Sequence, residues 1–255
     1  MKKNPVAKEQ RFFDINRFPS SKGILVFGIS MSRIANAQDA ERNWSDIEHL
    51  VKKIHKTEGV GLTILYSDYL YMHTDEAANK VQDRLLGQML EHKKRFIARL
   101  SKKSWYIPRS FSFLTYGQAV LNCKCPFIDC LRMVENLYTK DKRFQAYVLA
   151  DVKRAGRSVK DRQAVPFVLN EIVMLHLLAK GQVELPNGYI NHHEKWILNC
   201  YPGKPLCSEV YLSRLNLWKL KNTKNRFEDS FYDLEGRKLY NYGAIDLARD
   251  QEIFA

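Results

Sequence analysis

Residues 23–30 read GILVFGIS, and this short stretch indicates how the chain folds. Four apolar residues, Ile24 to Phe27, form an unbroken run that stops at Gly28 and is followed by Ser30. Such a run is typical of a strand buried on both faces of a parallel sheet. Because ligands bind beyond the carboxyl ends of such strands, we expect Ser30 at the edge of the sheet where a site would form.

Further elements alternate between helix and strand. Apolar residues recur at helical spacing over 39–55, and GVGLTILY at 59–66 reads as a second buried strand. Strand, helix and strand in this order predict a parallel sheet in an α/β fold. The remaining expected elements are a helix at 75–103, a short strand within 104–116, one or two helices over 126–156, a helix at 161–180, a strand at 194–202 and an edge strand at 239–247.

The composition indicates a globular protein. The chain has 255 residues, of which 45% are hydrophobic, and no repeat or linker divides it. We therefore expect one domain over residues 1–255, with roughly the first 20 residues flexible. No apolar run is long enough to cross a membrane, and the basic N-terminus lacks the apolar stretch of a signal peptide. Five irregularly spaced cysteines suit a reducing compartment and favour neither disulfides nor zinc, so a cytoplasmic location is expected.

The chain is strongly basic, with a formal net charge of +13. Phosphate-bearing partners attract such a surface, and nucleic acid is the first candidate, with solubility alone as the alternative. On the helix predicted at 75–103, the residues Arg84, Gln88, Arg95, Arg99 and Lys102 fall within about 60° of one another. His92, Lys94 and Lys103 widen this basic stripe, and the apolar side is predicted to hold Leu86, Leu90, Ile97 and Leu100.

Gly28 and Ser30 match no common catalytic or nucleotide-binding motif. The serine lacks the glycine two residues later that a nucleophile elbow requires, and neither a P-loop nor a G-x-G-x-x-G loop is present. Gly28 has no Cβ and would let a ligand approach the backbone closely. From the local pattern alone, Ser30 could be a nucleophile or could merely cap the turn that follows.

Two later segments carry polar groups in apolar surroundings. AVPFVLNEIVMLHLLA at 164–179 is apolar almost all round, so we expect a buried helix on which Asn170, Glu171 and His176 are the polar exceptions. A buried carboxylate needs either a partner or a function, and a structural ion pair is the alternative for Glu171. Tyr201 ends the strand at 194–202 and would reach the same edge as Ser30 if the two strands are parallel.

In combination, these features resemble the tRNA-dependent cyclodipeptide synthases. In that family a Gly-x-Ser after the first strand carries the nucleophile, a later helix carries Tyr-x-x-x-Glu, and a downstream strand ends in a catalytic tyrosine. The matching residues are Gly28 to Ser30, Phe167 to Glu171, and Tyr201. A basic helix after the second strand contacts tRNA in the family. The order and approximate spacing agree over about residues 20–215.

The resemblance implies an α/β fold, a Rossmann-like parallel sheet flanked by helices and similar to the catalytic domain of class I tyrosyl- and tryptophanyl-tRNA synthetases. It implies that two aminoacyl-tRNAs are joined into a cyclodipeptide by a ping-pong mechanism through aminoacyl- and dipeptidyl-serine intermediates. No cofactor, metal, DNA or membrane is implied, and we expect a monomer. The implied catalytic residues are Ser30, Glu171 and Tyr201; the substrate-binding residues are Gly28, Arg33, Phe127, Phe167, Asn170 and Pro202; the tRNA-binding residues are Arg84, His92, Lys94, Arg95, Arg99, Lys102 and Lys103.

Four positions differ between branches of the family or depart from its pattern. Pro202 follows the catalytic tyrosine, and Arg33 stands where another branch has asparagine, so the chain resembles the Tyr-Pro branch. Phe167 replaces a tyrosine that helps to bind the aminoacyl amino group, and Phe127 replaces another tyrosine of the site. The loss at Phe167 keeps open a second hypothesis, a synthetase-like module that binds tRNA without catalysis.

Overall fold

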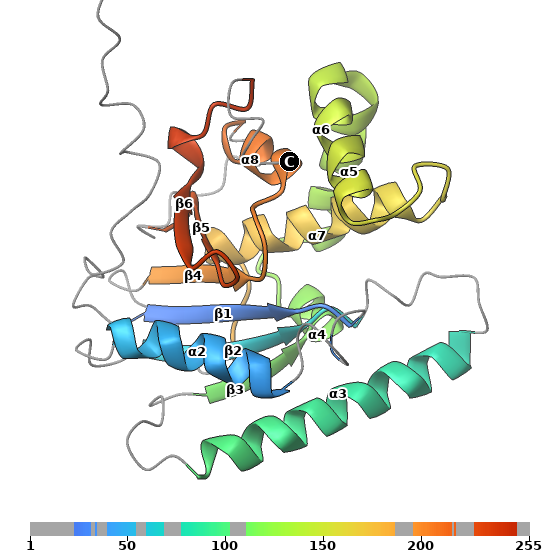
Figure 1. Cartoon of the computed structure of the whole chain (residues 1–255). Helices are drawn as coiled ribbons and strands as arrows, with labels where there is room; N and C mark the ends of the chain where they lie inside the picture. Colours follow the sequence, from blue (N-terminus) through green and yellow to red (C-terminus); the bar gives the residue numbers. More distant parts are fainter. Residues whose placement is uncertain are drawn as a thin grey trace, which may run out of the picture.

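The computed structural model describes residues 23–31, 34, 40–54, 60–68, 78–102, 111–186, 196–215, 217 and 227–248. The expectations for the first 20 residues, for Arg33 and for Lys103 lie outside these residues. The model confirms an α/β fold built on a six-stranded sheet in the order β3-β2-β1-β4-β5-β6 (Figure 1). The strands are β1 (Gly23–Ile29), β2 (Val60–Tyr66), β3 (Phe111–Thr115), β4 (Trp196–Tyr201), β5 (Ser230–Asp233) and β6 (Lys238–Asn241).

The strand β1 lies at the centre of the sheet and pairs in parallel with both β2 and β4. The chain first moves outward from β1 through β2 to β3, and then returns to add β4 and β5 on the other side. The strand order therefore reverses between β1 and β4, and such a switch point is where open α/β sheets bind ligands. Only β6 runs antiparallel to its neighbour, β5.

Helices cover both faces of the sheet (Figure 1). One face packs against α2 (Ala40–Ile54) and α3 (Ala78–Leu100), and the other against α7 (Ala164–Ala179). Side chains of β1 alternate between these layers, with Leu25 and Phe27 in the first and Ile24 and Val26 in the second. This alternation accounts for the unbroken apolar run, because both faces of the strand are buried. The other helices are α4 (Tyr116–Leu121), α5 (Phe127–Lys140), α6 (Lys142–Arg154) and α8 (Cys207–Ser213).

The helix α3 is present as predicted, but the face assigned to its apolar side is wrong. Leu86, Leu90 and Ile97 are 50%, 53% and 45% exposed, whereas His92 and Phe96 are buried. Phe96 stacks on Phe111 with ring centres 5.6 Å apart, and His92 Nδ1 lies 2.9 Å from the Tyr66 hydroxyl. Aromatic rings contribute large apolar areas, so this cluster determines which face of α3 docks on the sheet.

The C-terminal part of the chain adds elements that the sequence did not predict. The edge strand expected at 239–247 is β6, which ends at Asn241 and continues into a 3-10 turn, Tyr242–Ala244. The strand β5 and the helix α8, together with α4, were missed because each is only four to seven residues long. None of the helices in the described part of the chain combines the length and the apolar character that crossing a bilayer requires.

Two glycines provide a matched test of this packing. A Cβ at Gly23 would overlap the indole ring of Trp196 on the neighbouring strand, whereas a Cβ at Gly87 on α3 would meet nothing within 4 Å. We expect Gly23→Ala to lower the free energy of unfolding by about 1–3 kcal/mol through overpacking. Gly87→Ala should raise it by up to about 1 kcal/mol, because alanine favours the helix. Urea unfolding measures both, and a Gly23→Ala protein as stable as the wild type would contradict the β1–β4 packing.

Candidate active site

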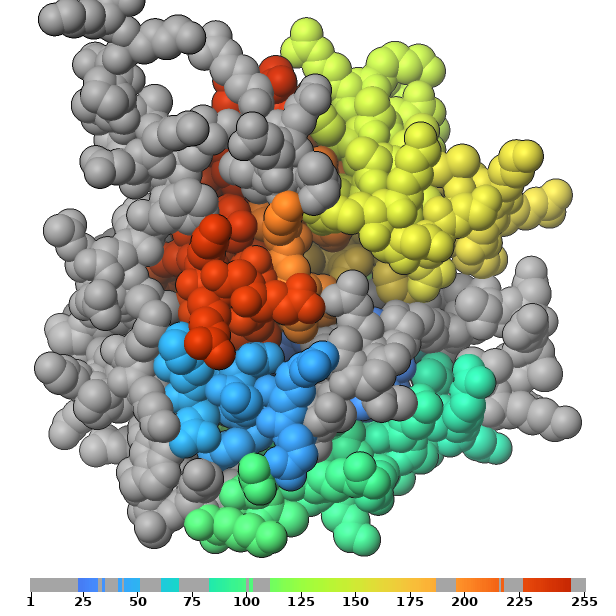
Figure 2. Space-filling view, viewed as in Figure 1, coloured from blue at the N-terminus to red at the C-terminus, as the bar shows by residue number. Residues whose placement is uncertain are grey.

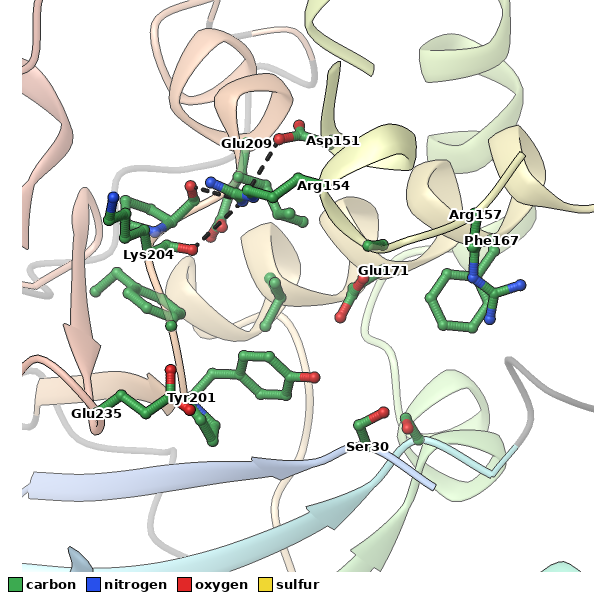
Figure 3. Close-up of a pocket in the computed structure, with 18 residues that line it drawn as sticks. Ser30, Asp151, Arg154, Arg157, Phe167, Glu171, Tyr201, Lys204, Glu209 and Glu235 are labelled. Carbon is green, nitrogen blue, oxygen red and sulfur yellow. Dashed lines mark hydrogen bonds and ion pairs between the residues drawn. The ribbon is translucent and has the colours of Figure 1, made fainter. Parts of the chain in front are cut away.

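A pocket of about 400 Å³ opens at the carboxyl ends of β1 and β4. Its walls come from the residues after these two strands, from the end of α6 and from one side of α7 and α8. The space-filling view shows the hollow between the orange residues that follow β4 and the yellow end of α6 (Figure 2). Ser30, Glu171 and Tyr201, which the sequence places in three distant segments, all line this pocket (Figure 3).

Ser30 is the first residue after β1 and is 7% exposed. The turn that carries it is held by Ser67, the first residue after β2. The Ser67 hydroxyl donates to the Ile29 carbonyl at 3.0 Å and accepts from the Met31 amide at 3.3 Å. Ser67 thus bonds to both neighbours of Ser30 and limits the positions that its hydroxyl can take.

Tyr201 is the last residue of β4, and its ring lies over Gly28 of β1. A Cβ on Gly28 would stand 2.9 Å from the Tyr201 ring, closer than real Cβ atoms approach a neighbour. Glycine is therefore required for this contact, and not only for ligand approach. Beyond Tyr201 the chain turns at Gly203, whose φ of 101° suits glycine and whose amide donates to Asp233 at 3.0 Å.

Glu171 lies on α7 and reaches into the pocket between Tyr201 and the end of α6 (Figure 3). The helix is buried as predicted, but Glu171 itself is half-buried, because the pocket exposes it. One turn earlier on α7, Phe167 lines the pocket beneath the guanidinium of Arg157, which stands 3.9 Å from the ring centre. This cation–π contact places a cation over the face of the Phe167 ring at the pocket wall.

The end of α6 clamps the segment between β4 and α8. Asp151 is 1% exposed and accepts hydrogen bonds from the amides of Cys207 and Ser208 at 2.9 and 2.8 Å, and from the Ser208 hydroxyl at 2.6 Å. Burial raises the pKa of Asp151, and Arg154 together with these hydrogen bonds opposes the shift. Arg154 donates to the Pro205 carbonyl at 2.9 Å. The pocket wall after Tyr201 is therefore tied to α6.

Glu209 on α8 is a further carboxyl in the pocket wall and is only 2% exposed. Its Oε1 accepts a hydrogen bond from the Tyr242 hydroxyl at 2.7 Å. Burial is the main cause that raises the pKa of Glu209 to about 8, and the charges of Glu171 and Asp151 act in the same direction. Near neutral pH this carboxyl can therefore hold its proton.

Some residues expected in the site lie elsewhere. Phe127 is buried in the core, edge-on to the ring of Tyr116, and does not line the pocket. Pro202 lines the pocket. Asn170 does not line it, and its side-chain amide donates to the Pro166 carbonyl at 2.8 Å. His92, assigned to the basic stripe, is 4% exposed and bonds to Tyr66. His92 is therefore a core residue of α3, and its assignment as a tRNA contact is wrong.

The rest of the basic stripe on α3 is exposed. Arg95 pairs with Glu91 at 2.8 Å within the helix, and Arg99 pairs with Glu41 of α2 at 2.7 Å. Arg84, Lys94 and Lys102 are exposed as well, so the stripe extends over most of the helix. The two ion pairs reduce the net positive charge on one part of the stripe, leaving Arg84, Lys94 and Lys102 as its main cationic contributors.

Several lining residues were missed from the sequence: Ser67, Asp151, Arg154, Arg157, Lys204, Glu209 and Glu235. Lys204 lies three residues after Tyr201, so proximity to the predicted strand end was a usable signal. No such signal existed for Arg154 or Glu209, because tertiary packing alone brings α6 and α8 to the pocket. Within the described residues, no group of three or more His, Cys, Asp or Glu side chains could hold a metal ion.

No known family model matches this chain, and no curated protein matches it either. Solved structures resemble it. A structure of a CDPS (cyclodipeptide synthase) from Fluoribacter dumoffii has a TM-score of 0.54 and 14% identity over 88% of this chain and 92% of that one. A CDPS from Staphylococcus haemolyticus has a TM-score of 0.52 and 12% identity over 86% and 92%. At these identities the likeness establishes a shared fold over most of each chain.

Glu209 gives the site a distinctive dependence on pH. The pKa of Glu209 is about 8 in the folded protein, above its ordinary value of 4.5, so between these pH values the native state keeps a proton that the unfolded state has released. The contribution of Glu209 to the free energy of unfolding therefore falls as pH rises from about 4.5 to 8 and is constant above that range. Glu209→Gln cannot titrate and preserves the acceptor for Tyr242.

We expect the free energy of unfolding of Glu209→Gln, minus that of the wild type, to rise between about pH 4.5 and 8. The slope of this difference against pH corresponds to at most about one proton. Denaturant unfolding of both proteins across this range measures the difference. His176, whose pKa burial lowers to about 3, has the opposite effect in both proteins and cancels in the comparison. A difference that does not change with pH would contradict the assigned shift.

Proposed function

We propose that this protein is a cyclodipeptide synthase that uses two aminoacyl-tRNAs. The observation that carries the proposal is the convergence of Ser30, Glu171 and Tyr201 on one pocket at the switch point of the sheet. These are the residues that the family resemblance assigns to catalysis. The fold shared with two CDPS structures over most of the chain supports the same conclusion.

The first step is attack on an activated ester. The Ser30 oxygen attacks the ester carbonyl of the first aminoacyl-tRNA, the bond to the ribose oxygen breaks, and the proton of Ser30 passes to the departing tRNA. Glu171 pairs with the substrate ammonium group and orients the carbonyl towards Ser30. Because Phe167 has no hydroxyl, Glu171 provides more of this recognition than in relatives that carry a tyrosine there.

The second step forms the peptide bond. The amino group of the second aminoacyl-tRNA attacks the aminoacyl-serine ester, which frees Ser30 and leaves a dipeptide on the second tRNA. Ser30 then takes the dipeptidyl group and releases that tRNA. The free amino group of the dipeptide attacks the new ester, closes the diketopiperazine ring and restores Ser30. No nucleotide is consumed, because both substrates arrive activated.

Tyr201 and Gly28 are proposed to act together in these steps. The packing of the Tyr201 ring on Gly28 limits the positions available to the tyrosine hydroxyl beside Ser30. A hydroxyl in this place can relay a proton from the attacking amine to the departing serine oxygen during cyclisation. Pro202, which follows it and is buried, fixes the backbone at the end of β4.

The exposed cations of α3 are proposed to bind tRNA. Arg84 and Lys94 on α3 and Lys102 just after its end present positive charge along one line, and a phosphate backbone binds such a surface with release of counterions. The alternative function, a module that binds tRNA without catalysis, would need this helix but not Ser30. Phe167 favours that alternative, while the pocket with its three converging residues favours catalysis.

Ser30→Ala should abolish cyclodipeptide formation, because no acyl-enzyme can form without the hydroxyl. Expression in a bacterial host with mass spectrometry of the medium measures the product. We expect at least a 100-fold loss, of the order that removing a covalent nucleophile produces. Intact protein mass after incubation with aminoacyl-tRNA should show an aminoacyl adduct on the wild type and none on Ser30→Ala.

Ser213→Ala is the matched control, since this serine only bonds the Val210 carbonyl at 2.9 Å within α8 and does not line the pocket. It should keep both product and adduct. Cyclodipeptide production by Ser30→Ala at the wild-type level would refute the mechanism. Tight tRNA binding by a wild-type protein that forms neither adduct nor product would instead favour the binding module.

Reversal of the three exposed α3 cations to Glu (Arg84, Lys94 and Lys102) should weaken aminoacyl-tRNA binding at least tenfold. The logarithm of the association constant decreases with the logarithm of the salt concentration, and the magnitude of this slope should fall by up to about three, one for each lost phosphate contact. A filter-binding titration at several salt concentrations gives both numbers. An equal charge change at Lys140, Lys142 and Arg143, which lie where α5 meets α6, is the control. Equal losses in the two triple variants would show that net charge, and not α3, determines binding.

A further inference from the structure

The end of the pocket away from Ser30 contains two buried polar atoms that the proposed reaction does not use. Figure 3 shows Glu209 and Arg154 side by side there, with Tyr201 and Glu171 between them and Ser30. Glu209 Oε2 and Arg154 Nη1 are both buried, and neither has a hydrogen-bond partner among the described residues. Both residues line the pocket.

The other atoms of these side chains are held firmly. Glu209 Oε1 is occupied by the Tyr242 hydroxyl at 2.7 Å. Arg154 Nη2 donates to the Pro205 carbonyl at 2.9 Å and lies 3.5 Å from Asp151 Oδ1. The contacts fix each group while leaving one nitrogen of Arg154 and one oxygen of Glu209 unused.

Buried polar atoms in folded proteins almost always have hydrogen-bond partners. Two such atoms without a partner, in side chains that line a pocket, therefore call for an explanation. A ligand that supplied both partners would recover the lost hydrogen bonds. An apolar ligand would leave both atoms unpaired and would be rejected strongly for that reason. This end of the pocket is therefore built to recognise a polar group.

The chemistry of the two atoms narrows the class of that group. Arg154 Nη1 can only donate, so the group must accept a hydrogen bond there. Because the pKa of Glu209 is about 8, its free oxygen donates when the carboxyl is protonated and accepts when it is ionised. Charges of both signs lie near these atoms, Arg154 on one side and Glu171 and Asp151 on the other, so neither a cationic nor an anionic group is attracted by all of its surroundings. A neutral group that both accepts and donates fits either state of Glu209.

We propose that this end of the pocket binds the side chain of one of the two amino acids, and that this side chain ends in a carboxamide. The amide oxygen would accept from Arg154 Nη1 and, while Glu209 is protonated, from Glu209 Oε2; when Glu209 is ionised, the amide nitrogen would donate to Oε2 instead. The inference rests on the proposed function, since it names a substrate of that same pocket. It predicts a product that contains asparagine or glutamine.

The composition of the wild-type product tests this directly. A bacterial host supplies all twenty aminoacyl-tRNAs, so mass spectrometry of the medium after expression reports which residues the protein selects. Cyclodipeptides that contain asparagine or glutamine are expected. Cyclodipeptides that contain neither asparagine nor glutamine would overturn the inference and leave the proposed function intact. No cyclodipeptide at all would overturn the proposed function, and this inference with it.

Two variants separate recognition from structure. Glu209→Met keeps the length of the side chain but cannot hydrogen-bond, and it should lower the share of carboxamide-containing product about tenfold or more in favour of apolar residues. Glu209→Gln keeps an acceptor for Tyr242 and a donor towards the pocket, and should largely retain the preference. Circular dichroism and thermal unfolding establish that both variants fold. An unchanged product ratio in a folded Glu209→Met protein would overturn the proposal, and if that variant does not fold, the wild-type product composition still decides.

Discussion

The parallel pairing of β1 with β4, closed by the ring of Tyr201 over Gly28, is the constraint on which the site depends. It joins two segments separated by more than 160 residues and makes both end at the same edge of the sheet. No side chain larger than hydrogen fits at Gly28 without moving the ring. Ser30 follows two residues later, so the distance between the serine and the tyrosine is limited by backbone hydrogen bonds. Rigid strands position reacting groups more accurately than loops do.

A second constraint comes from α6, which has no part in the sheet. Asp151 accepts hydrogen bonds from the first amides of α8, and Arg154 donates to the carbonyls of Lys204 and Pro205, so the connection after Tyr201 is held at both ends. The same two residues bring charge to the pocket wall beside Glu209. Structural support and chemical character thus come from one set of side chains, and Arg154 Nη1 stays buried without a hydrogen-bond partner among the described residues.

The helix α3 shows where a helical pattern is insufficient. Two apolar rows run along it, one with Leu86, Leu90 and Ile97 and the other with Leu85 and Phe96. Spacing alone cannot choose between them, because the members of each row are separated by close to whole helical turns. The choice is made by the aromatic rings that β3 and α2 present to Phe96, and these come from other segments of the chain. Once that face docks, His92 is carried into the core and the basic stripe loses one member.

By itself the sequence determined the α/β class, the parallel pairing around GILVFGIS and the edge at which Ser30 and Tyr201 would meet. Continuous apolar strands that alternate with helices have few other ways to bury both faces of a sheet. The tertiary structure decided which face of α3 is buried, that Glu171 is half-exposed in a pocket, and that Asp151, Arg154 and Glu209 meet there. Those outcomes depend on packing between segments far apart in the chain, and a periodic pattern carries no information about which surface a helix will contact or which helices will come together.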